Sequence, residues 1–329
     1  MQAAPAITSI TVRNPADGSV VGSVPIDTPD TVAAKAAALR AAQPEWEALG
    51  PSGRKPWLLK LQDWILDNAE HLSDVLQSET GKPRTEAAME PPLCADLLKY
   101  WAGNAEKFLA DRHPPSHSPL GKVKRLTTTH RPYPVVGLII PWNFPLLNVA
   151  LDGVAPLAAG AAVLLKPSEV TPLSAVEFTR GWTEIGAPPV LALTTGYAET
   201  GAAVIANADC VHFTGSTATG RKVAVACAER LIPCSLELGG KDPAIVLADA
   251  DLERAAAGIA WGGMFNSGQV CVSVERVYVE APVYDEFVAR LTEAVAGLRQ
   301  GKDDDKYRFD VGAMATAAHA ASVDSAARA

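Results

Sequence analysis

The sequence predicts an α/β protein with a doubly wound parallel sheet, a second α/β unit and an extended β-arm. Three observations predict this fold. Residues 28–112 place apolar side chains at helical spacing, whereas residues 121–133 are rich in threonine and suit an extended chain. From Pro134 onward, short apolar runs rich in β-branched residues alternate with helical stretches. Such alternation is typical of a parallel sheet that helices cover on both faces.

The first part of the chain is expected to be helical. Thr28-Pro29-Asp30 offers a capping hydroxyl and a proline suited to the first helical turn. A second helical segment ends near Gly81-Lys82-Pro83. We expect its apolar face to bury core, through Trp57, Leu58, Leu61, Trp64, Ile65, Leu72, Val75 and Leu76.

The alternating part supplies the strands and helices of the sheet. Its strand-like runs lie at 135–140, 162–165, 190–194, 211–213 and 244–247. The helical stretches lie at 147–157, 173–185, 202–206, 217–231 and 252–265. Ligands bind beyond the carboxyl ends of the strands in such sheets. The polar or glycine residues that follow a predicted strand at this edge are Asn143, Lys166, Gly196 and Gly215.

Composition excludes several classes of partner. The chain has 329 residues, which is enough for two domains. Its net charge is −8 and it has no Lys/Arg run, so no nucleic-acid partner is expected. The five cysteines are odd in number and form no C-x-x-C pair, and the six histidines have no metal-binding spacing. We therefore expect no metal site, no disulfide framework and a reducing cytoplasmic location.

A membrane location is also not expected. No signal peptide is visible at the N-terminus. Residues 134–165 contain one charged residue, Asp152, and are long enough to cross a bilayer. However, Pro141, Pro145 and Pro156 interrupt this stretch, and prolines at that density break a continuous helix. The stretch is interpreted as strand, loop, buried helix and strand.

A carboxylate and a thiol stand in glycine-rich settings in the second half of the chain. They are Glu237, before Leu238-Gly239-Gly240, and Cys271, after Asn266-Ser267-Gly268-Gln269-Val270. A thiolate can attack a carbonyl group, and a carboxylate can activate the water that releases a thioester. The pair suggests an enzyme with a covalent acyl intermediate. A buried inert cysteine is the alternative, and it is the interpretation we give to Cys94, Cys210, Cys227 and Cys234.

Three further motifs fit a nucleotide-binding cleft, and each has a structural alternative. Asn143, between Pro141-Trp142 and Phe144-Pro145, can donate to an oxyanion, or the segment is a loop with an aromatic plug. Lys166-Pro167-Ser168-Glu169 can grip ribose hydroxyls, or it is a helix start capped by Ser168 or Thr171. The stretch from Phe213 to Gly220 can hold a pyrophosphate at a helix N-terminus, although it is not G-x-G-x-x-G.

Taken in order, these motifs resemble the NAD(P)-dependent aldehyde dehydrogenase superfamily. The resemblance runs from Asn14-Pro15-Ala16 to at least Val311-Gly312 and includes Glu79-Thr80-Gly81-Lys82-Pro83. The spacings also agree with the family, with 34 residues from Glu237 to Cys271 and 23 from Asn143 to Lys166.

The resemblance implies a role for each catalytic candidate. Cys271 would be the nucleophile that attacks an aldehyde. The side chain of Asn143 and the backbone N–H of Cys271 would hold the oxyanion. Hydride transfer would leave a thioester, and Glu237 would activate the water that hydrolyses it to a carboxylic acid.

The resemblance also implies a cofactor site. Lys166 and Glu169 match the pair that grips the adenosine ribose, and Gly215-Ser216 match the pyrophosphate turn. The carboxylate of Glu169 would repel a 2′-phosphate, so NAD is favoured, with NADP possible. One departure is Ala198, where the family commonly has a glycine. The implied contacts are Ile140, Pro141, Trp142, Lys166, Ser168, Glu169, Gly196, Gly215, Ser216, Thr219, Leu238 and Gly239.

The resemblance divides the chain into parts. Residues 1–120 and 134–237 would form the dinucleotide-binding domain, 121–133 an oligomerisation arm, and 238–329 the N-terminal part of the catalytic domain. The later Glu-x-Phe-Gly-Pro segment of the family is absent, as is the strand that pairs with the arm of a partner subunit. We therefore expect a C-terminally truncated member with an incomplete catalytic domain, whose relatives form homodimers or homotetramers.

Three functions follow from this comparison. The first is an NAD-dependent aldehyde dehydrogenase acting on a small aldehyde. The second is a catalytically impaired fragment that at most binds nucleotide or a full-length homologue. The third is a CoA-acylating relative, which Glu237 argues against, because that branch needs no hydrolytic base.

Overall fold

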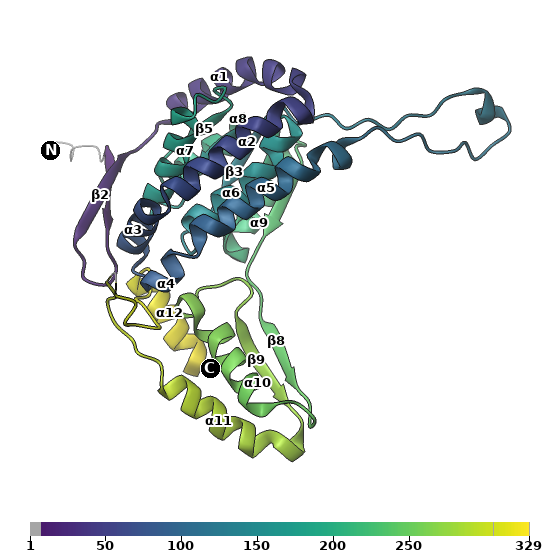
Figure 1. The fold of residues 1–329 in the computed structure, drawn as a ribbon. Coiled ribbons are helices and arrows are strands. Elements are labelled where there is room, and N and C mark those ends of the chain that lie inside the picture. The colour runs from purple at the N-terminus through teal and green to yellow at the C-terminus, as the bar shows by residue number, and fades with distance from the viewer. Residues whose placement is uncertain (1–7, 305, 329) are drawn as a thin grey trace.

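The computed structural model describes residues 8–304 and 306–328. A larger body holds the five-stranded sheet and most of the helices, and a smaller body holds the C-terminal strands and helices (Figure 1). A long excursion leaves the larger body between residues 110 and 134 (Figure 1).

The larger body is built on a parallel sheet of five strands in the order β5-β4-β3-β6-β7. The chain enters the sheet at the central strand β3 and adds β4 and then β5 on one side. It then adds β6 and β7 on the other side of β3. The strands are β3 (Val135–Ile139), β4 (Ala162–Lys166), β5 (Leu191–Leu193), β6 (Cys210–Thr214) and β7 (Cys234–Glu237). The direction of winding therefore reverses between β3 and β6, which is where doubly wound folds bind ligands.

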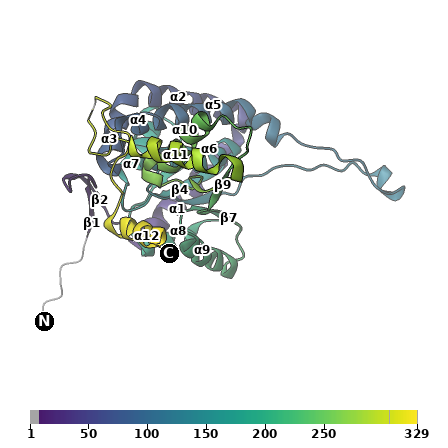
Figure 2. The ribbon, with the colours of Figure 1, turned by 90° about the horizontal axis from the view of Figure 1, so that it is seen from below.

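Helices cover both faces of this sheet, as predicted (Figure 2). One face packs against α1 (Pro29–Ala48), α8 (Ala198–Asn207) and α9 (Thr217–Glu229), and the other against α6 (Pro145–Ala159) and α7 (Leu173–Glu184). An outer layer lies over α6 and α7 and consists of α2 (Gly50–Asp67), α3 (Ala69–Thr80) and α5 (Glu90–Leu109). The short helix α4 (Arg84–Ala87) links this layer to the smaller body.

Local signals at the helix ends are confirmed. Thr28 caps α1 by accepting a hydrogen bond from the N–H of Thr31. The left-handed conformation of Gly81, with a φ of 68°, ends α3 where the sequence indicated. The second predicted helix is interrupted at Asn68, so its apolar face is divided between α2 and α3.

Some strands differ from the sequence prediction. The run at 244–247 forms β8 (Asp242–Val246), but β8 pairs with β9 (Val274–Val279) in a separate parallel sheet, covered by α10 (Leu252–Met264). The edge strand β7 was not predicted, because it has only four residues that alternate between half-buried and exposed. An N-terminal hairpin, β1 (Ser9–Arg13) and β2 (Val20–Pro25), was also not predicted.

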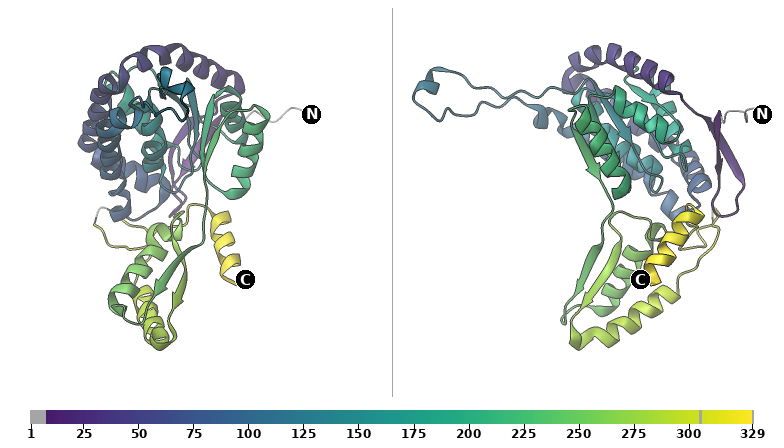
Figure 3. Two further views of the ribbon diagram at one scale, coloured as in Figure 1. Left: turned by 90° about the vertical axis from the view of Figure 1, so that its right-hand side faces the viewer. Right: turned by 180° about the vertical axis from the view of Figure 1, so that it is seen from behind.

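The arm at 121–133 is extended but is not a regular strand. It contains the short 3-10 helix η1 (Leu120–Val123), and one isolated bridge joins Arg112 to Thr128. The excursion projects far from both bodies (Figure 3), so it has few neighbours with which to form a ladder.

The smaller body also holds η2 (Phe265–Gly268), η3 (Ala281–Val283), α11 (Tyr284–Ala296) and α12 (Ala317–Arg328). Among the residues described, no helix has the length and apolarity required to cross a membrane.

One glycine of the central strand lets a helix approach closely. A Cβ added to the buried Gly137 would lie 2.7 Å from Val204 Cγ1 and 3.0 Å from Ala208 Cβ, at the end of α8. We expect Gly137→Ala to lower the free energy of unfolding by about 1–3 kcal/mol, because α8 must move away. In the matched variant Gly103→Ala, the added Cβ meets no atom within 4 Å and lies on an exposed helix face. That variant should gain about 0.5–1 kcal/mol. Urea denaturation of both variants measures the difference, and equal effects would contradict the packing argument.

Candidate active site

A cavity of about 380 Å³ lies at the carboxyl edge of the five-stranded sheet, where the smaller body joins it. It brings together the three residues proposed for catalysis, Asn143, Glu237 and Cys271. Its walls come from the loop after β3, the ends of β6 and β7, the loop before β9, and helix α12. The other lining residues are Pro141, Trp142, Phe144, Asn148, Thr214, Gly215, Ser216, Leu238, Gly239, Gly268, Gln269, Val270, Glu275, His319 and Val323.

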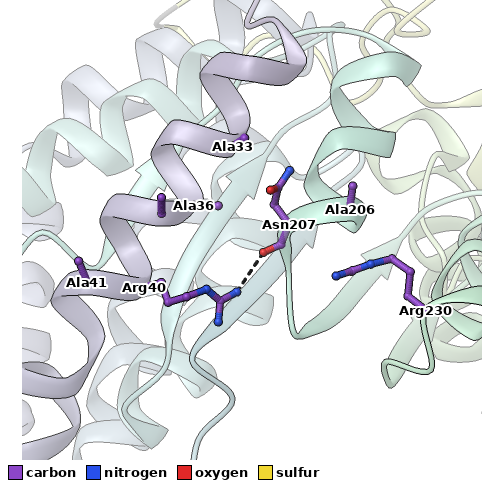
Figure 4. Close-up of a pocket in the computed structure, with 8 residues that line it drawn as sticks. Ala33, Ala36, Arg40, Ala41, Ala206, Asn207 and Arg230 are labelled. Atoms are coloured by element: carbon purple, nitrogen blue, oxygen red, sulfur yellow. Dashed lines mark hydrogen bonds between the residues drawn. The ribbon is translucent and has the colours of Figure 1, made fainter.

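A second hollow of about 500 Å³ lies between α1, α8 and α9 (Figure 4). Its two arginines already have protein partners. Arg40 donates to Asp209 and to the carbonyl of Asn207, and Arg230 donates to the carbonyl of Ala208. These contacts join α1 and α9 to the segment before β6, so the two arginines that line this hollow stabilise the packing of the helices.

Asn143 is held in the cavity by hydrogen bonds on both its side chain and its backbone. Its Nδ2 donates to the carbonyl of Gln269 at 2.9 Å, and its Oδ1 accepts from Asn148 Nδ2 at 3.3 Å. Its backbone carbonyl accepts from Lys82 Nζ and from Asn266 Nδ2, each at 2.9 Å. Because an amide carries two N–H donors, the bond to Gln269 orients the group without exhausting its donors.

A buried ion pair supports the loop that carries Asn143. Lys82 Nζ lies 2.7 Å from Glu90 Oε1, and each side chain is only 1% exposed. Glu90 Oε2 accepts the backbone N–H groups of Leu146 and Leu147 in the first turn of α6. Lys82 also lies 4.4 Å from the ring centroid of Phe144. The outer helical layer therefore fixes both ends of the segment from Asn143 to the start of α6.

The thiol of Cys271 is free and exposed, and it follows a backbone segment in an uncommon conformation. Asn266, Ser267 and Gly268 all have positive φ angles, of 51°, 57° and 73°. Such backbone strain persists only where the surroundings hold it, and it is concentrated at functional sites. Here the N–H of Asn266 donates to Glu86 Oε1 at 2.7 Å, and Gln269 Nε2 donates to the carbonyl of Asn266 at 2.9 Å.

Two buried carboxyl groups, Glu79 on α3 and Glu86 on α4, accept backbone N–H groups from segments far away in the chain. Burial raises the pKa of Glu86 to about 7, although the N–H of Asn266 and the charge of Lys82 oppose this shift. Burial likewise raises the pKa of Glu79 to about 7 against its hydrogen bonds from Ser174 and Leu173. The carboxylate of Glu79 accepts the first N–H groups of α7, the helix that follows the Lys166 segment, and so caps that helix.

Glu237 stands at the carboxyl end of the edge strand β7 and is exposed. Its register partner is Thr214 of β6, and its carbonyl accepts the N–H of Gly215 at 2.9 Å. Leu238 and Gly239 continue from it along the cavity wall. A Cβ added to Gly239 would meet no atom within 4 Å, so open space lies against this glycine.

The predicted cofactor residues follow β3, β4, β5, β6 and β7 at the same edge, but only some of them line the cavity. Pro141, Trp142, Gly215, Ser216, Leu238 and Gly239 line it, whereas Ile140, Lys166, Ser168, Glu169, Gly196 and Thr219 do not. Ser216 caps α9 by accepting from the N–H of Thr219. The ring of Trp142 meets the ring of His319 edge to face, with centroids 5.0 Å apart.

The segment after β4 is not a helix start capped by Ser168 or Thr171, because α7 begins only at Leu173 and Glu79 accepts its first N–H groups. Lys166 is buried, with Nζ 2.9 Å from the carbonyl of Pro167 and 3.7 Å from Glu169 Oε2. Burial lowers the pKa of Lys166, and the charge of Glu169 opposes that shift. The hydroxyl of Ser168 accepts the N–H of Val170, so it stabilises the loop locally. Gly196, after β5, leaves no room for a Cβ, which would lie 1.9 Å from Thr200 Oγ1.

Comparison with known proteins agrees with this geometry. The model of the aldehyde dehydrogenase family matches residues 2–329. The chain belongs to the aldehyde dehydrogenase family. It is 38% identical over 298 residues to a glutarate-semialdehyde dehydrogenase of Pseudomonas putida, covering 89% of this chain and 61% of that protein.

Solved structures of aldehyde dehydrogenases extend the comparison. Lactaldehyde dehydrogenase from Escherichia coli superposes with a TM-score of 0.93 at 34% identity, covering 98% of this chain and 67% of the other. PnpE in complex with nicotinamide adenine dinucleotide gives a TM-score of 0.91 at 33% identity, covering 96% and 65%. The chain spans 57–64% of the length of the first curated relatives that it matches, so it is shorter than these aldehyde dehydrogenases.

Several residues that support the candidate site were not found from the sequence. Glu86 and Glu90 carry no signal in their own segments, because each acts on a loop far away in the chain. Asn266 was quoted only as part of the segment before Cys271, and its contact with the carbonyl of Asn143 was not predicted. Lys82 was interpreted as part of a helix end and of a family motif, without a contact to Asn143. Within residues 8–304 and 306–328, no group of three or more His, Cys, Asp or Glu side chains could hold a metal ion.

Proposed function

We propose that this chain carries out the chemistry of an NAD-dependent aldehyde dehydrogenase, oxidising a small aldehyde to a carboxylic acid. The observation that supports it most is the single cavity lined by Cys271, Asn143 and Glu237. A nucleophile, an amide donor and a carboxylate base on one open cavity are the groups that thioester formation and hydrolysis require.

Each of the three residues has one role in the proposed reaction. The thiolate of Cys271 attacks the aldehyde carbon and forms a C–S bond. The amide of Asn143 and the N–H of Cys271 stabilise the oxyanion, and loss of one such donor typically costs about 100-fold or more in rate. Glu237 then takes a proton from the water that attacks the thioester, and the C–S bond breaks to release the acid.

The nicotinamide cofactor, when bound, supplies the hydride acceptor that turns the thiohemiacetal into the thioester. Its proposed partners are Lys166 and Glu169 for the adenosine ribose and Gly215-Ser216 at the N-terminus of α9 for the pyrophosphate. The open space beside Gly239 fits a ring that approaches the backbone closely. The carboxylate of Glu169 favours NAD over NADP, because it would repel a 2′-phosphate.

The organisation and location of the protein are part of the same proposal. Residues 1–120 and 134–237 form the dinucleotide-binding domain, and 238–329 form the N-terminal part of a catalytic domain. The excursion at 121–133 serves as an oligomerisation arm in a homodimer or homotetramer. The five free cysteines fit a reducing cytoplasm.

The second candidate is a catalytically impaired fragment that binds nucleotide or a longer homologue. Two observations favour it. The chain spans 57–64% of its first curated relatives. The β8–β9 sheet also leaves large apolar side chains in solvent, with Ile245 71% and Tyr278 54% exposed, and exposed apolar surface of this kind marks an interaction site.

The two candidates differ in the first turnover. Mixed with NAD and a small aldehyde, an active chain should produce an NADH burst equal to the concentration of Cys271. The variant Glu237→Gln should keep the burst and lose steady-state acid formation, because only thioester hydrolysis needs the base. Nucleotide binding without any burst would favour the fragment, and a lost burst with intact hydrolysis in Glu237→Gln would contradict the role given to Glu237.

A further inference from the structure

The side chain of Asn266 joins the two loops that carry the proposed oxyanion donors. Its Nδ2 donates to the carbonyl of Asn143 at 2.9 Å and to the carbonyl of Gln269 at 3.3 Å. Asn143 Nδ2 donates to the same carbonyl of Gln269 at 2.9 Å. The two side-chain amides and the two carbonyls therefore form a closed ring of hydrogen bonds between the loop after β3 and the segment before Cys271.

The backbone of Asn266 is itself held firmly. The residue is only 3% exposed. Its N–H donates to Glu86 Oε1 on α4 at 2.7 Å. Its carbonyl accepts the N–H of Gln269 at 3.0 Å and Gln269 Nε2 at 2.9 Å. Because these contacts fix the backbone on both sides, the amide of Asn266 is a fixed point to which the loop of Asn143 is bound.

Asparagine meets two separate demands at this position. The φ of Asn266 is 51°, in the left-handed region, where asparagine occurs more readily than most residues other than glycine. Its amide also has two N–H donors, one for each of the two carbonyls. Glycine would meet the first demand without the second, so one substitution can separate the backbone role from the role of the amide.

Stability alone does not explain the amide of Asn266. The carbonyl of Asn143 also accepts from Lys82 Nζ, and the carbonyl of Gln269 also accepts from Asn143 Nδ2. Loss of the Asn266 amide therefore leaves each carbonyl with another donor. The large cost of deleting a buried hydrogen bond comes from groups left without a partner. What the deletion removes here is the fixed position of one loop relative to the other.

This relative position matters for the proposed oxyanion site. The amide of Asn143 and the N–H of Cys271 must converge on a single oxygen atom. Gln269 lies two residues before Cys271, so the position of its carbonyl restricts where that N–H lies. A misplacement of about 1 Å, even one caused far from the reacting atoms, can cost roughly 100-fold in rate.

We propose that Asn266 is a positioning residue that fixes the amide of Asn143 and the N–H of Cys271 relative to each other, so that both donors meet the same oxyanion. This inference rests on the proposed function, since it takes the oxyanion role of Asn143 from it. Asn266 does not line the cavity, so it acts through these two donors and not on the substrate itself.

Two reactions of the Cys271 thiol test the proposal without cofactor. An activated ester acylates the thiolate through a tetrahedral oxyanion, whereas iodoacetamide alkylates it by losing iodide from a CH2 group, without an oxyanion. We expect Asn266→Gly to be acylated roughly 10- to 100-fold more slowly than the wild type and to be alkylated at the wild-type rate. Intact mass measures both reactions, and Cys271→Ala gives the background from the other cysteines.

Ser267→Gly is the matched control, at the next residue along the chain. Ser267 has a φ of 57°, so glycine replaces a side chain in the same backbone region. Its hydroxyl donates to the carbonyl of Gly312 at 3.2 Å and takes no part in the ring. Ser267→Gly should therefore keep both reaction rates.

NMR tests the ring without any reaction at Cys271. In the whole chain, 15N relaxation gives the order parameter of the Asn143 side-chain amide, whose signal is assigned with Asn143→Ser. This order parameter should fall in Asn266→Gly, because the loop is no longer bound to a fixed point, and should stay unchanged in Ser267→Gly.

Each outcome decides between the positioning role and the proposed function. Acylation of Asn266→Gly at the wild-type rate, or equal slowing of acylation and alkylation, would overturn the positioning role. Failure of the wild type to be acylated would overturn the proposed function. The positioning role would then still be overturned by an unchanged order parameter of Asn143. If Asn266→Gly does not fold, Asn266→Asp should show the same split between the two reactions, because a carboxylate has no N–H to donate.

Discussion

Replacing Cys271 by alanine is expected to abolish the NADH burst and all acid formation while nucleotide binding persists. Alanine removes the sulfur that forms the C–S bond, and no other described thiol lines the cavity. Loss of the nucleophile in a serine protease costs about 10⁶-fold in rate, which sets the scale of the effect. Rapid mixing with NAD and aldehyde measures the burst, and intact mass after treatment with an activated ester measures acylation.

The matched control for this variant is Cys234→Ala, at a half-buried thiol on β7 that packs against α9. It should keep both the burst and the mass shift. A burst of normal size in Cys271→Ala would contradict the assignment of the nucleophile. Loss of nucleotide binding in Cys271→Ala would instead point to a general disturbance of the cleft.

Replacing Glu90 by alanine should be the most destabilising of the changes considered. The variant leaves the ammonium of Lys82 buried without its carboxylate and removes the acceptor for two N–H groups of α6. Breaking a buried ion pair by removing one partner costs about 3–5 kcal/mol. The midpoint of urea denaturation at neutral pH should therefore fall strongly. Asn143 should also lose its fixed orientation, because Lys82 anchors its carbonyl.

Glu286→Ala provides the comparison, since Glu286 forms an exposed ion pair with Arg290 on α11. Exposed pairs contribute little to stability, so this variant should unfold at the wild-type urea concentration. Equal midpoints for Glu90→Ala and Glu286→Ala would show that burial does not amplify the effect of the Lys82 pair, and the role given to the outer helical layer would then be wrong.

The fold could be predicted where burial leaves a local pattern. The strands β3 and β4 are buried almost throughout, so they are continuous apolar runs in the sequence. The end of α3 was visible because Gly81 adopts a conformation that glycine favours. The edge strand β7 was missed, since two of its four residues, Ser235 and Glu237, are polar and exposed, so that it resembles a loop.

The candidate site was predictable for a different reason. Asn143, Glu237 and Cys271 stand in short motifs whose order and spacing identify a family, so they were found without any three-dimensional information. Their supports were not, because the contacts of Glu90 with α6 and of Lys82 with Asn143 join segments about 60 residues apart. Pairing of this kind depends on which helix faces which strand, and no local pattern encodes it.

The hydrogen bond from Asn266 to Glu86 joins positions 180 residues apart, and it has a consequence for biogenesis. On the ribosome, α4 and the loop that carries Asn143 emerge long before the strained segment that precedes Cys271. Domains generally fold from the N-terminal side during synthesis. The thiol of Cys271 is therefore presented to a scaffold that already exists, and translation order matches the order in which the candidate site can be assembled.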